Sequence, residues 1–265
     1  MRFETIPLST EDPDIVLDAY IADPIRLLTR KAILVIPGGA YSAICADREG
    51  EPIAHAFLAR GFNTFVLKYS TGRKRPFPAQ LLEAAAAIKH IKDNADSYGI
   101  DPEELYITGF SAGGHLCACC GILWDHESIR KTLDMPFGYN KPKGILPIYP
   151  VINDHEDSFK NLWCTDIPSD AQLQQVKLDQ HVNKNSVPAF MVHTFSDQCV
   201  PVQNTLDLAC AYNKASVPFE LHISPRAITA SPWATESRSV SAPPGTNLPW
   251  QNGWIWPLPG SISSK

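Results

Sequence analysis

The chain has 265 residues, 44% of them hydrophobic, and a formal net charge of −5 at pH 7. This length and composition suffice for one large α/β domain with a substantial core. The weak negative charge, without a long block of lysine or arginine, excludes the electrostatic footprint of a nucleic-acid-binding protein. A small neutral or polar molecule is therefore the expected partner.

The first residues, MRFETIPLSTEDPD, contain no apolar segment typical of a signal peptide. No stretch approaches the roughly 18 uninterrupted apolar residues of a membrane span. We therefore expect a cytoplasmic protein with no membrane partner. The sequence does not indicate an oligomeric state.

The seven cysteines are odd in number and scattered, which favours reduced thiols over a disulfide framework. Cys117 and Cys120 form a CxxC within the apolar run LCACCGILW, but no second ligand pair has zinc-like spacing. We expect Cys117, Cys119 and Cys120 to be buried, inert thiols, and we expect neither a metal nor another cofactor.

Apolar runs of strand length alternate with helical patterns over residues 1–224, which we interpret as one α/β domain. The expected strands are 32–37, 64–69, 105–110, 144–149, 189–195 and 219–223, and the expected helices are 51–60, 79–95 and 203–215. Strands apolar on both faces predict a mostly parallel sheet with helices on both sides and ligands at the carboxyl ends of the strands. Residues 152–187 are polar and irregular, and we expect a cap-like insertion able to wall a substrate site.

The segment Pro37-Gly38-Gly39-Ala40-Tyr41 directly follows the first of these strands. Its glycines allow backbone N–H groups to face a ligand, so Gly39 and Ala40, together with Ala112, are natural donors of an oxyanion hole. The alternative for this segment taken by itself is an ordinary Gly-Gly turn, which the motif around Ser111 disfavours.

Gly109-Phe110-Ser111-Ala112-Gly113-Gly114 follows the strand LYIT and opens the apolar helical pattern HLCACCGIL. A strand, a tight turn and a helix are the context that a G-x-S-x-G nucleophile elbow requires. The glycines are expected where packing leaves no room for a Cβ atom. Ser111 is thereby predicted to be a nucleophile at a helix amino terminus, which favours developing negative charge.

The pair Ser196-Asp197 directly follows the strand AFMVHTF, which places Asp197 at the same predicted sheet edge as Ser111. A carboxylate at this position can orient an imidazole, and the order serine, aspartate, histidine is that of the α/β-hydrolases. The alternative is that Asp197 caps a helix beginning near Pro201.

Five motifs between residues 31 and 224 together resemble the esterase branch of the α/β-hydrolases that includes acetylxylan- and feruloyl-esterase-like proteins and neighbours the hormone-sensitive-lipase group; they are IPGGAY, REGEPIA, DPEELYITGFSAGGH, FSDQCVPV and VPFELHI. The resemblance implies an α/β-hydrolase fold and a serine carboxylesterase in which Ser111 is the nucleophile, Asp197 the acid, and Gly39, Ala40 and Ala112 the oxyanion donors. Pro37 replaces the histidine of the commoner HGGG pattern.

The family places its catalytic histidine in the loop after the last strand, which here reads SPRAITASPW. Only His222 follows Asp197, and it lies within the expected strand FELHI. His222 could serve as the base only if that strand ended early, and otherwise it packs beside the sheet. His115, four residues after Ser111, is expected to pack or to face solvent.

Residues 225–265 differ from the rest of the chain: they hold seven of the 23 prolines and four of the six tryptophans but a single acidic residue, Glu236. Prolines at this density leave little room for the amphipathic helix that normally closes such a sheet. Regrouping the codons of Ala227–Ala230 by one base allows His-His-Gly, and regrouping those of Trp250–Pro257 gives a helix-like pattern. We therefore expect a frame-shifted, poorly ordered tail, which the encoding DNA would reveal through an open shifted frame.

These observations favour a serine esterase acting on small acyl esters, such as acetyl groups on plant-derived sugars, with impaired proton transfer. A peptidase or an acyl transferase could use the same elbow, although the sequence offers no gating domain for a peptidase. The absent histidine also supports a different class, a small-ligand binding protein on a hydrolase scaffold.

Overall fold

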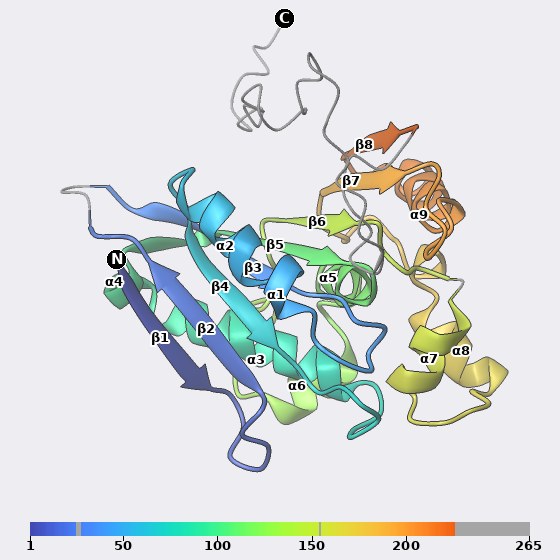
Figure 1. The fold of residues 1–265 in the computed structure, drawn as a ribbon, viewed down its shortest axis with the longest axis horizontal. Helices are drawn as coiled ribbons and strands as arrows, with labels where there is room; N and C mark the ends of the chain where they lie inside the picture. Colours follow the sequence, from blue (N-terminus) through green and yellow to red (C-terminus); the bar gives the residue numbers. More distant parts are fainter. Residues whose placement is uncertain (25–27, 154, 226–265) are drawn as a thin grey trace, which may run out of the picture. The chain divides into compact units, whose positions relative to one another are not determined.

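Residues 1–24, 28–153 and 155–225 are described in a computed structural model of the chain. They form an eight-stranded sheet in the order β1-β2-β4-β3-β5-β6-β7-β8, shown in Figure 1. The strands from β4 to β8 in this order are parallel, and β1 and β2 run antiparallel at one edge. The predicted mostly parallel sheet is confirmed.

The six strands expected from the sequence are present; β5 begins five residues earlier than expected, and the others differ by one or two residues at their ends. They are β3 (Arg30–Ile36), β4 (Asn63–Lys68), β5 (Ile100–Phe110), β6 (Gly144–Ile148), β7 (Ala189–Thr194) and β8 (Phe219–Ser224). The hairpin of β1 (Arg2–Pro7) and β2 (Val16–Ile21) was not expected. β1 has no fully buried residue, so its sequence lacks the apolar run on which the other strands were recognised.

The helices expected at 51–60, 79–95 and 203–215 correspond to α2 (Glu51–Leu58), α3 (Ala79–Asp93) and α9 (Gln203–Lys214). The remaining helices in the described ranges are α1 (Ala46–Glu49), α4 (Ala95–Tyr98), α5 (Ala112–Ile122), α6 (Glu127–Thr132), α7 (Glu156–Leu162), α8 (Asp170–Val176) and the 3₁₀ helix η1 (Leu178–Gln180). None of the described helices is long and apolar enough to cross a membrane.

The insertion between β6 and β7 is less irregular than its sequence indicated. It contains α7, α8 and η1, and the side chains of Phe159, Leu162, Val176 and Leu178 are buried in the main core. Ser169 and Gln172 form a reciprocal capping box at the start of α8. Each of these short helices buries only one or two apolar side chains, so the sequence shows no helical pattern of apolar residues.

The larger core lies between the sheet and one layer of helices that contributes buried residues from α3, α5 and α9. On the other face, α2 contacts β2, β3 and β4. Helix α5 is buried along its whole length, including Cys117, Cys119 and Cys120. Burial raises the pKa of these thiols, which disfavours the reactive thiolate and agrees with the expected packing role.

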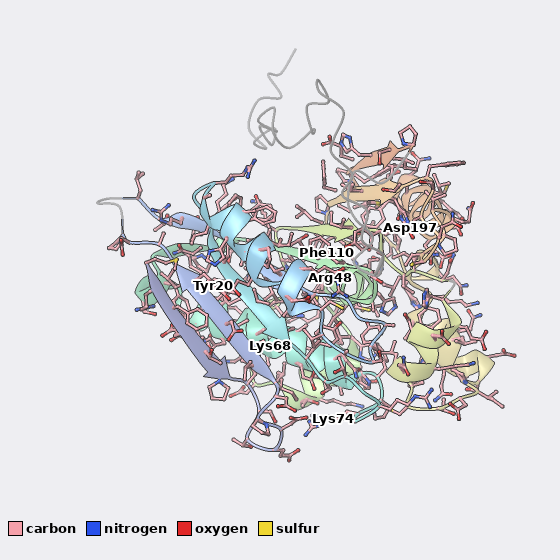
Figure 2. The ribbon with its side chains drawn as sticks, in the orientation of Figure 1. Tyr20, Arg48, Lys68, Lys74, Phe110 and Asp197 are labelled. Atoms are coloured by element: carbon pink, nitrogen blue, oxygen red, sulfur yellow. The ribbon has the colours of Figure 1, made fainter. Side chains whose placement is uncertain are left out.

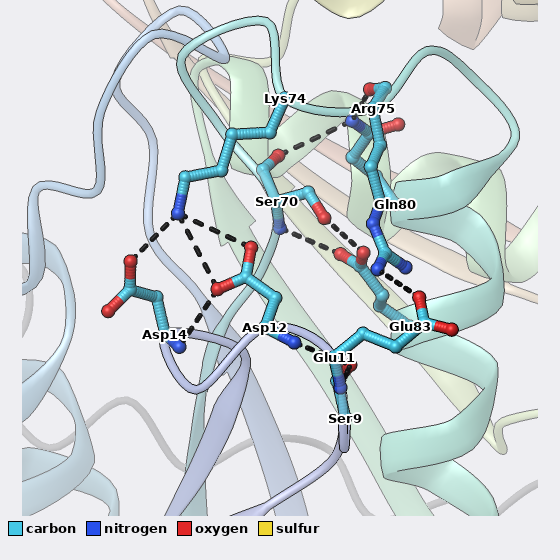
Figure 3. Close-up of polar contacts among 9 residues, drawn as sticks. All are labelled: Ser9, Glu11, Asp12, Asp14, Ser70, Lys74, Arg75, Gln80 and Glu83. Atoms are coloured by element: carbon cyan, nitrogen blue, oxygen red, sulfur yellow. Dashed lines mark hydrogen bonds and ion pairs between the residues drawn. The ribbon is translucent and has the colours of Figure 1, made fainter.

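Polar contacts brace the loop that follows β4 (Figure 3). The Ser70 backbone N–H and hydroxyl both donate to the carboxylate of Glu83 on α3. Lys74 pairs with Asp12 and Asp14 in the turn between β1 and β2. The unexpected hairpin is thus joined to the carboxyl edge of the parallel strands.

Two histidines are core residues. His115 on α5 is fully buried, accepts a hydrogen bond at Nδ1 from the Tyr41 hydroxyl (2.8 Å) and donates from Nε2 to the carbonyl of Val176 (2.8 Å). His193 on β7 donates from Nε2 to the carbonyl of Val200 (3.0 Å) and contacts the Thr205 hydroxyl through Nδ1 (2.6 Å). Burial lowers the pKa of both rings, that of His115 to about 4, so both are neutral at pH 7.

The approach of α5 to β3 predicts the effect of one substitution. A Cβ atom on Gly113 would lie 2.2 Å from the carbonyl oxygen of Ile36 and 2.4 Å from that of Pro37. Because both neighbours are backbone, Gly113→Ala should lower the free energy of unfolding by more than about 3 kcal/mol or prevent folding. In the control Gly99→Ala, φ is 62° and no atom lies within 4 Å of the added Cβ, so a loss of about 1–2 kcal/mol is expected. Urea unfolding distinguishes the two, and equal losses would contradict the packing argument.

The buried His115 predicts a pH dependence of stability. Its folded pKa of about 4 lies below its ordinary value of 6.5, so the unfolded chain takes up a proton first as pH falls. This group's contribution is complete above pH 6.5 and is lost between pH 6.5 and 4, with about 2 kcal/mol lost from pH 7.5 to pH 5. Urea midpoints at the two pH values should therefore differ less in His115→Gln than in the wild type. An identical difference in both proteins would show that His115 carries no such linkage.

Candidate functional site

Ser111 lies between β5 and α5 with φ 53° and ψ −119°, a conformation that a non-glycine residue rarely adopts. Such strain costs on the order of 1–3 kcal/mol and persists only when surrounding structure enforces it. The flanking glycines do so: a Cβ atom on Gly109 would lie 2.2 Å from the carbonyl oxygen of Gly113. The predicted strand, turn and helix are present, and the half-buried Ser111 lies at the turn.

The peptide that follows Ser111 is fixed in orientation. The Ser111 carbonyl accepts the backbone N–H groups of His115 (3.1 Å) and Val151 (3.1 Å). In a trans peptide the N–H points opposite to the carbonyl, so the Ala112 N–H points away from both of these donors. At the amino terminus of α5 it has no partner within its own helix.

The loop after β3 lies against this turn. A Cβ atom on Gly38 would lie 3.0 Å from the Cβ of Ser111 and 2.6 Å from the carbonyl oxygen of Phe110. The first peptide of the loop is held at both ends, because the Tyr69 hydroxyl donates to the Pro37 carbonyl (2.8 Å) and the Gly38 N–H donates to Oε2 of Glu49 (2.7 Å).

The next two peptide groups, Gly38–Gly39 and Gly39–Ala40, are held only through hydrogen bonds to their carbonyl oxygens. The Gly38 carbonyl accepts the Cys45 N–H (3.0 Å), and the Gly39 carbonyl accepts the Ser42 N–H (2.9 Å). The N–H groups of Gly39 and Ala40 point opposite to these carbonyls, and neither donates to any residue in the described part of the chain. Two adjacent N–H groups thus remain available to a ligand.

Three consecutive residues of this loop have positive φ: Gly39 at 129°, Ala40 at 53° and Tyr41 at 57°. The Asn161 side chain on α7 donates to the Ala40 carbonyl (2.9 Å), and the Gly72 N–H donates to the Tyr41 carbonyl (3.0 Å). These bonds are made within the protein itself, so the N–H groups are oriented before any ligand binds, as stabilisation of an oxyanion requires.

Asp197 lies in the loop after β7 (Figure 2) and does not cap α9, which begins at Gln203 with Val202 as its N-cap residue. Its Oδ1 accepts the N–H groups of Cys199 (2.8 Å) and Val200 (2.9 Å). Its Oδ2 has no hydrogen-bond partner among the described residues, and the closest cationic or imidazole nitrogen is Nε2 of His193 at 3.8 Å. One carboxylate oxygen is therefore fixed and the other is available.

Ser111 and Asp197 follow strands β5 and β7, with β6 between them. Parallel strands present their carboxyl ends at one edge, and two strand spacings amount to roughly 10 Å. Tyr149, which follows β6, lies in this interval, and the nearby charges of Glu49 and Asp197 add to burial in raising its pKa.

His222 lies inside β8, which continues to Ser224, so the early strand end that its role as a base required does not occur. Its Nε2 contacts Oε1 of Glu220 (2.5 Å), and its ring packs on Phe190 at 4.9 Å between centroids. The loop beyond β8, including the stretch from Arg226 to Trp233 and the expected frame-shifted tail, lies outside the described residues.

All eight histidines fall within the described ranges, and seven of them precede Asp197. Each of these seven has a ring nitrogen bonded to a group other than Ser111 or Asp197: His55, His90, His115, His126, His155, His181 and His193. The part of the chain that the structure describes also contains no group of three potential metal ligands.

Two residues at the site, Glu49 and Asn161, had no role predicted from the sequence, although Glu49 lies within the motif REGEPIA. Glu49 has only 6% of its surface exposed although it belongs to the charged run ADREGE, and Asn161 belongs to the polar insertion. Their roles depend on contacts with the Gly38–Ala40 segment, eleven residues before Glu49 and 121 before Asn161, and periodicity does not reveal such contacts.

A solved acetyl ester-xyloside bifunctional hydrolase from Caldicellulosiruptor lactoaceticus resembles this chain with a TM-score of 0.76 and 33% identity, over 85% of this chain and 87% of that chain. Among curated proteins, endo-1,4-beta-xylanase B of Butyrivibrio fibrisolvens is 35% identical over 74% of this chain, and an acetylxylan esterase of Xylanibacter ruminicola is 28% identical over 74%. The chain spans only 32% and 40% of the lengths of these two relatives.

The family comparison agrees with these likenesses and with the sheet order. Residues 17–212 match the BD-FAE family, a segment that includes the loop after β3, the turn at Ser111 and Asp197. The chain therefore belongs to the BD-FAE family and has the α/β-hydrolase fold.

Proposed function

We propose that this chain is a carboxylic ester hydrolase acting on small acyl esters of the acetyl type, with Ser111 as the nucleophile. The observation that carries the proposal is the contact between the strained Ser111 turn and a loop whose Gly39 and Ala40 N–H groups are fixed and available. The names of an acetylxylan esterase and an acetyl ester-xyloside hydrolase among its relatives support an acetyl ester on a sugar as the substrate class.

In the proposed reaction, Oγ of Ser111 attacks the ester carbonyl carbon and a tetrahedral intermediate forms. The N–H groups of Gly39, Ala40 and Ala112 stabilise its oxyanion. Collapse releases the alcohol and leaves an acyl-enzyme at Ser111, which water then hydrolyses. Both steps require a base, and we assign to the available Oδ2 of Asp197 the role of accepting the N–H of an imidazole that would bridge it to Ser111.

No histidine follows His222 in the sequence, and the ring of His222 is bound to Glu220 inside β8. We therefore propose that proton transfer is impaired while the oxyanion donors remain. A frame shift near Ser224 remains our explanation for the missing histidine. Hydrolases deprived of a triad member retain on the order of 10³–10⁴-fold acceleration over water, so weak activity is expected.

A fluorophosphonate probe and p-nitrophenyl acetate test the nucleophile. The probe should attach to Ser111, and Ser111→Ala should abolish both labelling and the enzyme-dependent release of p-nitrophenol. Peptide mapping by mass spectrometry identifies the labelled residue, and the exposed Ser97→Ala serves as the matched control. Labelling of another serine, or unchanged turnover in Ser111→Ala, would refute the assignment.

Added imidazole tests the impaired base. If the missing component is an imidazole between Ser111 and Asp197, free imidazole should raise the rate of Ser111 acylation by at least about 10-fold with saturation, because general-base catalysis contributes about 10²–10⁴-fold. Asp197→Asn should weaken this rescue, and His222→Ala should leave it unchanged. Rates in Ser111→Ala correct for the direct reaction of imidazole with the ester. Full activity without imidazole that disappears in His222→Ala would instead make His222 the base.

A second candidate, a binding protein without turnover, is favoured by the absence of a histidine after His222. It predicts saturable binding of an acetyl ester with no covalent labelling of Ser111 and no imidazole rescue. A peptidase or an acyl transferase would use the same Ser111 turn, but no contact in the described residues favours an amide substrate or a second acceptor over water.

A further inference from the structure

Glu49 is a buried carboxylate behind the candidate oxyanion loop. It ends α1, its surface is 6% exposed, and its two oxygens have different partners. Oε2 accepts the Gly38 N–H (2.7 Å), and Oε1 accepts the Tyr149 hydroxyl (3.0 Å). Burial raises the pKa of Glu49, while the bonds from Gly38 and Tyr149 favour its carboxylate form and oppose that rise. A carboxyl group buried in this way is stabilised only while both bonds are kept.

The geometry points to Glu49 as the positioning residue of the oxyanion hole. The inference rests on the proposed function, because it assumes that the Gly39 and Ala40 N–H groups stabilise an oxyanion. Glu49 itself does not contact the substrate. Glu49 holds the Gly38 N–H while Tyr69 holds the Pro37 carbonyl, so the plane of this peptide is fixed from both sides. The following two peptides carry the N–H groups of Gly39 and Ala40.

The backbone that follows explains why such an anchor is needed. Gly39, Ala40 and Tyr41 have positive φ, which the chain would leave if its neighbours allowed it. Gly38 is where this strained segment joins β3, and a Cβ atom there would lie 2.8 Å from Oε2 of Glu49. Without the carboxylate, the Pro37–Gly38 peptide loses its only N–H acceptor and can rotate. The donors of Gly39 and Ala40 would then turn with it.

The second bond connects this anchor to the other side of the site. Tyr149 follows β6, has φ 36°, and lies close enough to Asp197 for that carboxylate to raise the pKa of its hydroxyl, after the larger effects of burial and of Glu49 itself. The Tyr149 hydroxyl therefore stays protonated and donates to Glu49. Glu49 is thereby held on one oxygen while the other holds Gly38.

A series of variants distinguishes positioning from packing. Glu49→Ala removes the acceptor and should lower kcat for p-nitrophenyl acetate by about 10²-fold, the order expected for loss of an oxyanion donor, with a much smaller change in KM. Glu49→Gln keeps an acceptor oxygen for Gly38 and should recover kcat to within about 10-fold of wild type. Glu51→Ala and Glu51→Gln are the matched controls. They make the same two substitutions at the exposed glutamate of α2.

The amide proton of Gly38 gives a readout that does not depend on turnover. In ¹H–¹⁵N spectra the Gly38 amide proton should resonate downfield, because a carboxylate accepts its hydrogen bond. The resonance should move upfield in Glu49→Gln, where the acceptor is a neutral amide. In Glu49→Ala, which has no acceptor, the downfield position should be lost. Unchanged kcat in Glu49→Ala with a folded spectrum would overturn the inference, as would failure of Glu49→Gln to recover any activity. If Ser111→Ala keeps full turnover, the proposed function fails, whereas the Gly38 resonance still tests the anchor by itself.

Discussion

The whole site depends on one close approach of backbone to backbone. Helix α5 begins so near the end of β3 that Gly113 has no space for a single additional carbon beside the carbonyls of Ile36 and Pro37. This contact sets the distance between the turn at Ser111 and the loop that starts at Pro37. Because both segments leave the carboxyl edge of the sheet side by side, the proposed nucleophile on one lies against the loop that carries the candidate N–H donors.

The chemistry offered at this edge comes mainly from peptide groups. The carbonyl of each peptide that presents a candidate donor is fixed by a hydrogen bond, and side chains from separate helices reinforce the arrangement: Glu49 from α1 and Asn161 from α7. Backbone dipoles held in this way need no reorganisation when negative charge develops next to them. His115 contributes from the core, where its neutral ring holds the hydroxyl of Tyr41.

Local pattern and motif context in the sequence were sufficient for the parallel strands, three principal helices, the glycine-flanked turn at Ser111 and the position of Asp197 after β7. The same reasoning missed β1, whose residues are exposed or half-buried and therefore lack an apolar run. It also missed α7 and α8, because their few core-facing residues are separated by polar ones. Glu49 was beyond its reach for a different reason: nothing in a charged run indicates that one member turns inward to meet a glycine eleven residues earlier.

The bond from Asn161 to the Ala40 carbonyl has a consequence for how such enzymes diversify. Asn161 also accepts a hydrogen bond from Arg73, which pairs with Asp166, so the segment between β6 and β7 is connected to two loops at the edge of the sheet. If the segment between β6 and β7 is exchanged, in evolution or by design, to accommodate a different alcohol, the hydrogen bond to the Ala40 carbonyl changes as well. Replacement segments that keep an amide donor at the position of Asn161 should change selectivity and retain reactivity. Segments without this donor would change selectivity and reactivity together.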